Sequence, residues 1–124
     1  CKEAGAKRAL PLAVSVPSHC ELMRPAADQL DDALAAITIS EPVIQVVNNV
    51  DVSVESSAAA IKDALVRQLY CPVQWTSTVE FLAAQGVEKI IEVGPGKVLT
   101  GLTKRIDKAL TSVAVNTPET LADL

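Results

Sequence analysis

The sequence is poor in aromatic residues, and this limits how its core can be built. Only Tyr70, Trp75 and Phe81 occur among 124 residues. A core must therefore consist of Ala, Val, Leu and Ile, and hydrophobic residues make up 49% of the chain. That fraction is enough to fill about one small domain.

Several other features are also missing. No uninterrupted apolar run approaches the roughly 18 residues of a membrane-spanning helix, so we expect no membrane association. The formal net charge of −4 argues against nucleic-acid binding, which needs a basic surface. Cys1, Cys20 and Cys71 are odd in number and widely spaced, so neither a disulfide framework nor a metal site is predicted. A reducing cytoplasm fits this cysteine usage best.

The first residues suggest a longer parent protein. The chain begins with Cys1, and residues 2–6 resemble the end of a helix closed by Gly5. A helix end without its helix is expected in the back part of a larger protein, whose front would supply partner elements.

Alternating strand-like and helix-like segments predict an α/β fold. Apolar and β-branched runs indicate strands at residues 8–16, 43–47, 89–93 and 112–115, of which 43–47 should be mostly buried. Three- and four-residue apolar spacing indicates helices at about residues 19–36, 57–70, 75–85 and 97–109. Strands separated by helices are expected to pair in parallel, with the helices covering the sheet.

His19 is the only histidine, and thus the one side chain expected to exchange a proton near neutral pH. Ser18 followed by Glu21 matches a capping box, which would place His19 in the first turn of a helix. The helix dipole disfavours a charged imidazole there, so a neutral, proton-accepting ring is expected. The alternative is a structural histidine that hydrogen-bonds within a loop.

The main-chain carbonyl of Gln68 is a candidate partner for an imidazole. Pro72 should end the preceding helix near Cys71, so the last carbonyls lack donors from their own helix. Such a carbonyl can accept the Nδ1 hydrogen and leave Nε2 free as a base. The sequence alone does not place His19 beside Gln68.

Other motifs leave their alternatives open. The segment Gly94–Lys97 joins a predicted strand to a predicted helix, a layout that can bind an anion or simply pack the helix on a sheet. It matches neither the Walker nor the dinucleotide-binding pattern. Asn48–Asp51 either lines a pocket or forms a structural turn. Cys20 and Cys71 are expected to be small packing residues.

Six segments together resemble a known family. They are Ala9–Leu12, Val14–Cys20, Val46–Asp51, Arg67–Tyr70, Pro72–Trp75 and Glu92–Leu102. In combination they resemble the C-terminal part of the bacterial malonyl-CoA:acyl carrier protein transacylases, which load malonyl units for fatty acid biosynthesis. The resemblance covers essentially the whole chain.

This resemblance implies both a fold and a reaction. Residues 15–124 would be the C-terminal portion of an α/β-hydrolase-like core, and residues 1–14 the end of a ferredoxin-like subdomain. A malonyl group would pass from coenzyme A, through a serine ester, to the thiol of acyl carrier protein. No cofactor is expected, since the coenzyme A thioester is a substrate. His19 would be the general base and acid, and the main-chain carbonyl of Gln68 would orient its ring.

The chain also departs from the family's pattern. The nucleophile elbow, the carboxylate-binding arginine and the oxyanion-hole segment are absent, and no Gly-x-Ser-x-Gly occurs. The missing N-terminal part is therefore an expected partner, and the isolated chain is expected to be inactive. One alternative is a non-catalytic binding or structural fragment that folds only against that missing part. Another is a phosphate-binding module that uses residues 94–97.

Two basic pairs are candidates for docking the acidic carrier protein. They are Lys7 with Arg8 and Lys104 with Arg105. Exposed basic clusters attract an acidic partner at long range. Ordinary solvated surface is the alternative explanation for both pairs.

Overall fold

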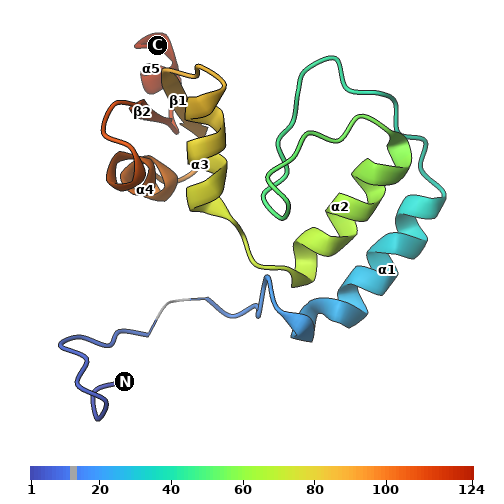
Figure 1. The fold of residues 1–124 in the computed structure, drawn as a ribbon, viewed down its shortest axis with the longest axis horizontal. Coiled ribbons are helices and arrows are strands. Elements are labelled where there is room, and N and C mark those ends of the chain that lie inside the picture. The colour runs from blue at the N-terminus through green and yellow to red at the C-terminus, as the bar shows by residue number, and fades with distance from the viewer. Residues whose placement is uncertain (12–13) are drawn as a thin grey trace.

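The computed structural model describes residues 1–11 and 14–124 as helices and strands joined by long irregular segments (Figure 1). The elements are η1 (Glu21–Met23), α1 (Arg24–Ala35), α2 (Ala58–Tyr70), α3 (Trp75–Ala84), β1 (Lys89–Val93), α4 (Val98–Ile106), β2 (Thr111–Val115) and α5 (Pro118–Ala122). The predicted α/β fold, with helices around a parallel strand pair, is confirmed.

The two strands form a parallel pair that is connected through α4. Lys89 pairs with Thr111 at one end and Val93 with Val115 at the other, without a bulge between them. Because parallel strands need a crossover, α4 returns the chain along the sheet and packs on both strands. Val79 of α3 and Thr103 of α4 are fully buried in the small core that results.

A separate helix pair is formed by α1 and α2, which lie side by side in opposite directions (Figure 1). Ala27, Leu34 and Ala64 are buried at the contact, where the small alanines let the helices approach closely. The α2 helix begins at Ser57, whose side chain accepts a hydrogen bond from the N–H of Ala60. This is an ordinary serine cap.

Two predicted strands are wrong. Residues 8–11 and 14–16 form no strand, and residues 12–13 of that prediction lie outside the described residues. Residues 43–47 contain only an isolated antiparallel bridge between Val47 and Val54. Val43 is fully exposed and Ile44 is 78% exposed. A β-branched run needs a neighbouring strand to become a strand, and the described chain places none beside it.

The predicted helix at residues 19–36 starts later than expected. Cys20 caps η1 without a side-chain hydrogen bond, so the Ser18 and Glu21 capping box is not formed. Glu21 instead pairs with Arg24 at 2.9 Å. His19 has φ 63°, a left-handed backbone that a first helical turn does not allow. The expected placement of His19 in the first turn of a helix is therefore wrong, and His19 lies directly before Cys20, the N-cap of η1.

The remaining helices and strands match the predicted positions within a few residues, except that α4 ends at Ile106 rather than near Ala109. The short α5 helix was not predicted. It begins with a capping box between Thr117 and Thr120, and Pro118 occupies the first turn. Among the helices of the described chain, none is both long and apolar enough to cross a membrane.

Candidate functional site

The carbonyl of Gln68 is left without a donor from its own helix. A helical carbonyl accepts a hydrogen bond from the N–H four residues later, which for Gln68 is Pro72, a residue with no N–H. The preceding bond is still present, since the N–H of Cys71 donates to the carbonyl of Arg67 at 2.9 Å. The regular pattern therefore stops at Gln68.

His19 donates to two carbonyls at this end of α2. Its Nδ1 lies 2.8 Å from the Gln68 oxygen, and its backbone N–H donates to the Leu69 oxygen at 2.9 Å. A carbonyl oxygen can only accept, so Nδ1 must carry the hydrogen. In the neutral ring, Nε2 then holds the free lone pair. The structure thus brings together the two residues that the sequence had suggested but had not placed.

The turn that contains His19 is attached to α2 by further contacts. The Arg24 guanidinium lies 3.5 Å from the centre of the Tyr70 ring, a cation–π contact with the last residue of α2. Glu21 accepts two hydrogen bonds from the same guanidinium, at 3.1 and 2.9 Å. Cys20 is exposed and its thiol donates to the carbonyl of Pro17, so its expected role as a packing residue is wrong.

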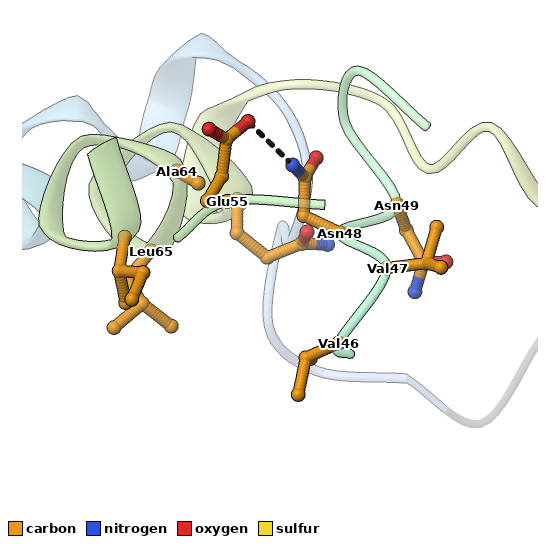
Figure 2. Close-up of a pocket in the computed structure, with 9 residues that line it drawn as sticks. Val46, Val47, Asn48, Asn49, Glu55, Ala64 and Leu65 are labelled. Atoms are coloured by element: carbon orange, nitrogen blue, oxygen red, sulfur yellow. Dashed lines mark hydrogen bonds between the residues drawn. The ribbon is translucent and has the colours of Figure 1, made fainter. Parts of the chain in front are cut away.

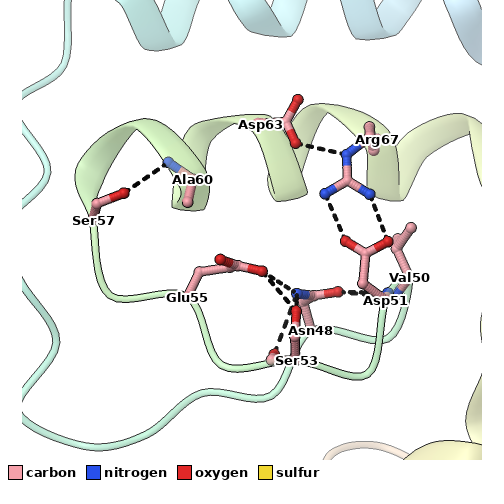
Figure 3. A network of polar contacts seen from close by, with 9 residues as sticks. All are labelled: Asn48, Val50, Asp51, Ser53, Glu55, Ser57, Ala60, Asp63 and Arg67. Atoms are coloured by element: carbon pink, nitrogen blue, oxygen red, sulfur yellow. Dashed lines mark hydrogen bonds and ion pairs between the residues drawn. The ribbon is translucent and has the colours of Figure 1, made fainter.

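Asn48 organises the loop that faces α2 (Figure 3). Its side-chain oxygen accepts the N–H groups of Val50 and Asp51 at 3.1 and 2.9 Å. Its amide nitrogen donates to the Ser53 carbonyl, the Ser53 hydroxyl and the Glu55 carboxylate at 3.2, 3.0 and 3.3 Å. This is a turn held by an asparagine side chain.

Arg67 connects this loop to the helix. Its guanidinium binds both carboxylate oxygens of Asp51, at 2.8 and 2.6 Å, and its Nε donates to Asp63 at 2.7 Å (Figure 3). The hydrogen bonds from Arg67 hold the pKa of Asp51 below its ordinary value. Those same bonds to Asp51 and Asp63 raise the pKa of Arg67, so the pair is charged on both sides.

An apolar pocket of about 190 Å³ lies between α2 and the loop (Figure 2). Its lining residues are Val46, Val47, Asn48, Asn49, Glu55, Ile61, Ala64, Leu65 and Gln68. The two interpretations of Asn48–Asp51 are therefore both partly right, because the segment forms a turn and its first two residues also line a pocket. Gln68 both lines the pocket and accepts the hydrogen bond from His19 Nδ1.

Beside the turn Gly94–Lys97, the backbone N–H groups that could bind an anion already donate to a carboxylate of the protein. The Glu92 carboxylate accepts the N–H groups of Leu99 and Thr100, at 3.2 and 2.7 Å, at the start of α4. Desolvation acts to raise the pKa of Glu92, but the hydrogen bonds from Thr100, Leu99 and Val98 lower it overall. A carboxylate in this place repels a second anion, so the geometry favours the packing interpretation over phosphate binding.

The basic residues expected to dock a carrier protein lie on two different elements. Lys7 and Arg8 are exposed on the N-terminal arm, and Lys104 and Arg105 are exposed in the last turn of α4. In the part of the chain that the structure describes, no group of three or more His, Cys, Asp or Glu residues could hold a metal ion.

Comparison with known proteins places this geometry in context. The chain is 70% identical over 122 residues to the malonyl CoA-acyl carrier protein transacylase of Salmonella typhimurium, and 48% identical over 120 residues to that of Bacillus subtilis. The resemblance to the malonyl CoA-acyl carrier protein transacylase family is confirmed. The Salmonella alignment covers 98% of this chain and 40% of the relative. The chain thus spans about 40% of the length of such transacylases. No protein-family model matches it.

Solved structures agree with the sequence comparison. An acyl carrier protein S-malonyltransferase from Vibrio cholerae is similar with a TM-score of 0.89 and 65% identity, over 99% of this chain and 40% of that one. A malonyl-transacylase in complex with a type II PKS acyl-carrier protein has a TM-score of 0.91 and 63% identity, over 98% and 40%. The described fold is therefore that of the matching part of these transacylases.

Proposed function

We propose that this chain provides the proton-transfer residue of a malonyl-CoA:acyl carrier protein transacylase acting in cytoplasmic fatty acid biosynthesis. The observation that carries the proposal is the 2.8 Å contact between His19 Nδ1 and the Gln68 carbonyl, which leaves Nε2 to act as the base. The high identity to transacylases over nearly the whole chain supports the choice of reaction. The nucleophilic serine would come from the N-terminal part of the complete enzyme.

The proposed reaction has two half-reactions. In the first, Nε2 of His19 takes the serine proton while the serine oxygen attacks the malonyl thioester carbon. The carbon–sulfur bond breaks, and the imidazolium returns the proton to the leaving coenzyme A thiolate. In the second, Nε2 takes the proton of the carrier-protein thiol while the sulfur attacks the carbonyl carbon of the serine ester. The ester carbon–oxygen bond breaks, and the imidazolium returns the proton to the serine oxygen. The chemistry needs no cofactor, because the thioester itself is the activated acyl group.

The Gln68 carbonyl has a positioning role in this proposal. Because it accepts only from Nδ1, it fixes the tautomer that has its basic nitrogen at Nε2. It also partly balances the positive charge that the ring acquires in each half-reaction. A similar arrangement, with a buried carboxylate instead of a carbonyl, orients the histidine of Ser-His-Asp enzymes.

We infer that residues 15–124 complete an α/β-hydrolase-like core and that residues 1–14 end a ferredoxin-like subdomain. The parallel β1 and β2 pair with its α4 crossover is the kind of unit from which such a core is built. The irregular course of residues 1–11 is compatible with a segment that belongs to another subdomain.

The catalytic test is His19→Ala in a complete transacylase, one that has the full length of its relatives and contains this sequence. Loss of a general base typically lowers kcat by about 10²- to 10⁴-fold. Ser18→Ala in the same exposed turn is the matched control and should retain the parent rate. A His19→Ala enzyme that transfers malonyl groups at nearly the parent rate would refute the proposal.

Carrier-protein docking by the basic pairs is part of the same proposal. It is supported by the exposure of all four side chains and by the similar transacylase that was solved in complex with an acyl-carrier protein. Charge reversal of Lys104 and Arg105, or of Lys7 and Arg8, should weaken carrier affinity at low salt and leave the reaction of malonyl-CoA unchanged. Reversal of Lys62 and Lys89 changes the net charge equally and serves as the control. Equal affinities in all variants would contradict docking at these pairs.

A second candidate is a non-catalytic fragment that folds or acts only with its missing part. It is favoured by the exposed apolar residues Val43, Ile44 and Val93, which would suit a protein–protein contact. Reconstitution with the missing N-terminal part separates the two candidates, because neither expects malonyl transfer by the chain alone. Transfer that is restored with this chain but not with its His19→Ala variant would support the first candidate, and equal transfer with both would support the non-catalytic one.

A further inference from the structure

We propose that the loop of residues 48–53 is a positioning device for the catalytic imidazole, and that Asp51 is its key positioning residue. The loop would act through the end of α2, by fixing the direction of the Gln68 carbonyl that holds His19. This inference rests on the proposed function of His19.

The loop has a defined shape of its own. The Asn48 side chain bonds to groups on both sides of the turn, from Val50 to Glu55 (Figure 3). Val52 inside it has φ 56°, a left-handed backbone that is unfavourable for a β-branched residue. Such strain persists only where the surrounding contacts determine the conformation, so the loop is held in one arrangement.

Asp51 fixes the chain on the N-terminal side of the Gln68 carbonyl. Its carboxylate forms a two-bond ion pair with Arg67, the residue immediately before Gln68. The Arg67 side chain is only 26% exposed and that of Asp51 40% exposed, so water competes less than at an open surface pair. Two parallel bonds also fix an angle, which a single contact does not.

Asn49, two residues before Asp51, fixes the chain on the C-terminal side of the Gln68 carbonyl. The N–H of Gln74 donates to the Asn49 carbonyl at 2.8 Å, and the Thr78 hydroxyl donates to the Asn49 side chain at 3.2 Å. Thr78 is buried in α3. Residues 67 and 74 are thus both held by one short loop, and Gln68 and Pro72 lie between them.

This arrangement has a direct consequence for the base. The Gln68 carbonyl receives no bond from its own helix, so its direction depends on how the chain is held on either side. A displacement of about 1 Å in a catalytic group can reduce the rate about 100-fold. Loss of the Asp51 contact should therefore lower kcat even though Asp51 does not touch His19.

The experiment compares Asp51→Asn with Asp63→Asn in a transacylase of full relative length. Both substitutions remove one carboxylate from Arg67, but Asp63 lies one turn earlier on α2 itself and does not connect the helix to the loop. We expect Asp51→Asn to lower kcat about ten- to a hundredfold with little change in KM, and Asp63→Asn to keep the parent kcat. Nitrogen NMR of the imidazole measures the fraction of rings with the hydrogen at Nδ1. This fraction should fall in Asp51→Asn and stay at the parent value in Asp63→Asn.

A conservative variant covers the case in which Asp51→Asn does not fold. Arg67→Lys keeps the charge but offers no planar fork, so it should show the same direction of change in kcat and in the Nδ1 fraction. Equal kcat values for Asp51→Asn and Asp63→Asn, or a lower kcat with an unchanged Nδ1 fraction, would overturn the inference. If His19→Ala is inactive while Asp51→Asn has the parent kcat, only the role of the loop fails. If His19→Ala is active, the proposed function itself fails.

Discussion

Replacement of Pro72 by alanine should weaken the hydrogen bond between His19 Nδ1 and the Gln68 carbonyl. Alanine restores the backbone N–H that the helix lacks at residue 72. Pro72 also keeps Cys71 extended, at φ −94° and ψ 149°, as expected for a residue before proline. Alanine removes both restrictions, so α2 can continue by one residue and its new N–H can donate to Gln68. The imidazole and this N–H then compete for the same carbonyl.

The size of the effect follows from the net value of one hydrogen bond. A bond of this kind contributes about 0.5–1.5 kcal/mol, so the ratio of anchored to released imidazole should fall about two- to tenfold. The Nδ1-bound hydrogen fraction, measured by nitrogen NMR in a transacylase of full relative length, reports this ratio directly. We expect kcat to fall with the anchored fraction of the imidazole, and therefore by no more than the fall in this ratio.

Pro118→Ala is the matched control for this experiment. It also replaces a proline beside a helix, but it lies at the start of α5. It should change neither the Nδ1 fraction nor kcat. An unchanged Nδ1 fraction in a well-folded Pro72→Ala protein would show that the missing N–H is not what makes the Gln68 carbonyl available.

Two further predictions concern stability, measured by urea unfolding. Because the hydrogen bonds lower the pKa of Glu92 from 4.5, its carboxylate stabilises the protein above that pH, and this stabilisation is lost as the pH falls through the lowered value. Glu92→Gln should thus be less stable than the parent at pH 7 but equally stable in strong acid, and a difference that persists in acid would exclude this cause. Leu110 is 7% exposed and Leu121 is 61% exposed. Leu110→Ala should cost about 2–5 kcal/mol and Leu121→Ala within about 0.5 kcal/mol, whereas equal losses would contradict the described core.

The parts of the fold that the sequence predicted well are those governed by neighbouring residues. The α2 helix was expected at residues 57–70 and spans Ala58–Tyr70, because Ser57 caps its start and Pro72 prevents its continuation. The β1 strand was expected and found at Lys89–Val93. In each case the helix or strand and the signals that bound it lie within a few residues of each other.

The failures depend on partners that are distant in the chain. Residues 43–47 have a strand-like composition, but composition does not indicate whether a second strand lies beside them. The capping box at Ser18 predicted a helical His19, whereas its backbone follows from bonds to Gln68 and Leu69, about fifty residues later. A local pattern could not reveal that competition.

In the candidate site too, features set by neighbouring residues were predictable and features set by distant residues were not. The free carbonyl of Gln68 was predictable from Pro72, since a helical carbonyl and its donor are only four residues apart. The ion pair between Asp51 and Arg67 was missed, because charged residues of opposite sign occur throughout the chain and their pairing depends on the path of the loop. Asn48 offered one local signal, as asparagine often bonds to the backbone two residues later.

The left-handed backbone at His19 has a consequence for how this chain could be stabilised. Glycine adopts such a backbone without steric cost, whereas a residue with a Cβ does not. A His19→Gly protein would relieve the strain and keep the backbone bond to Leu69, with water taking the place of the ring at Gln68. The strain relieved and the Nδ1 bond lost are each worth about 1 kcal/mol, so selection for heat resistance alone would not preserve the imidazole at this position, and screens for a more robust protein must include turnover.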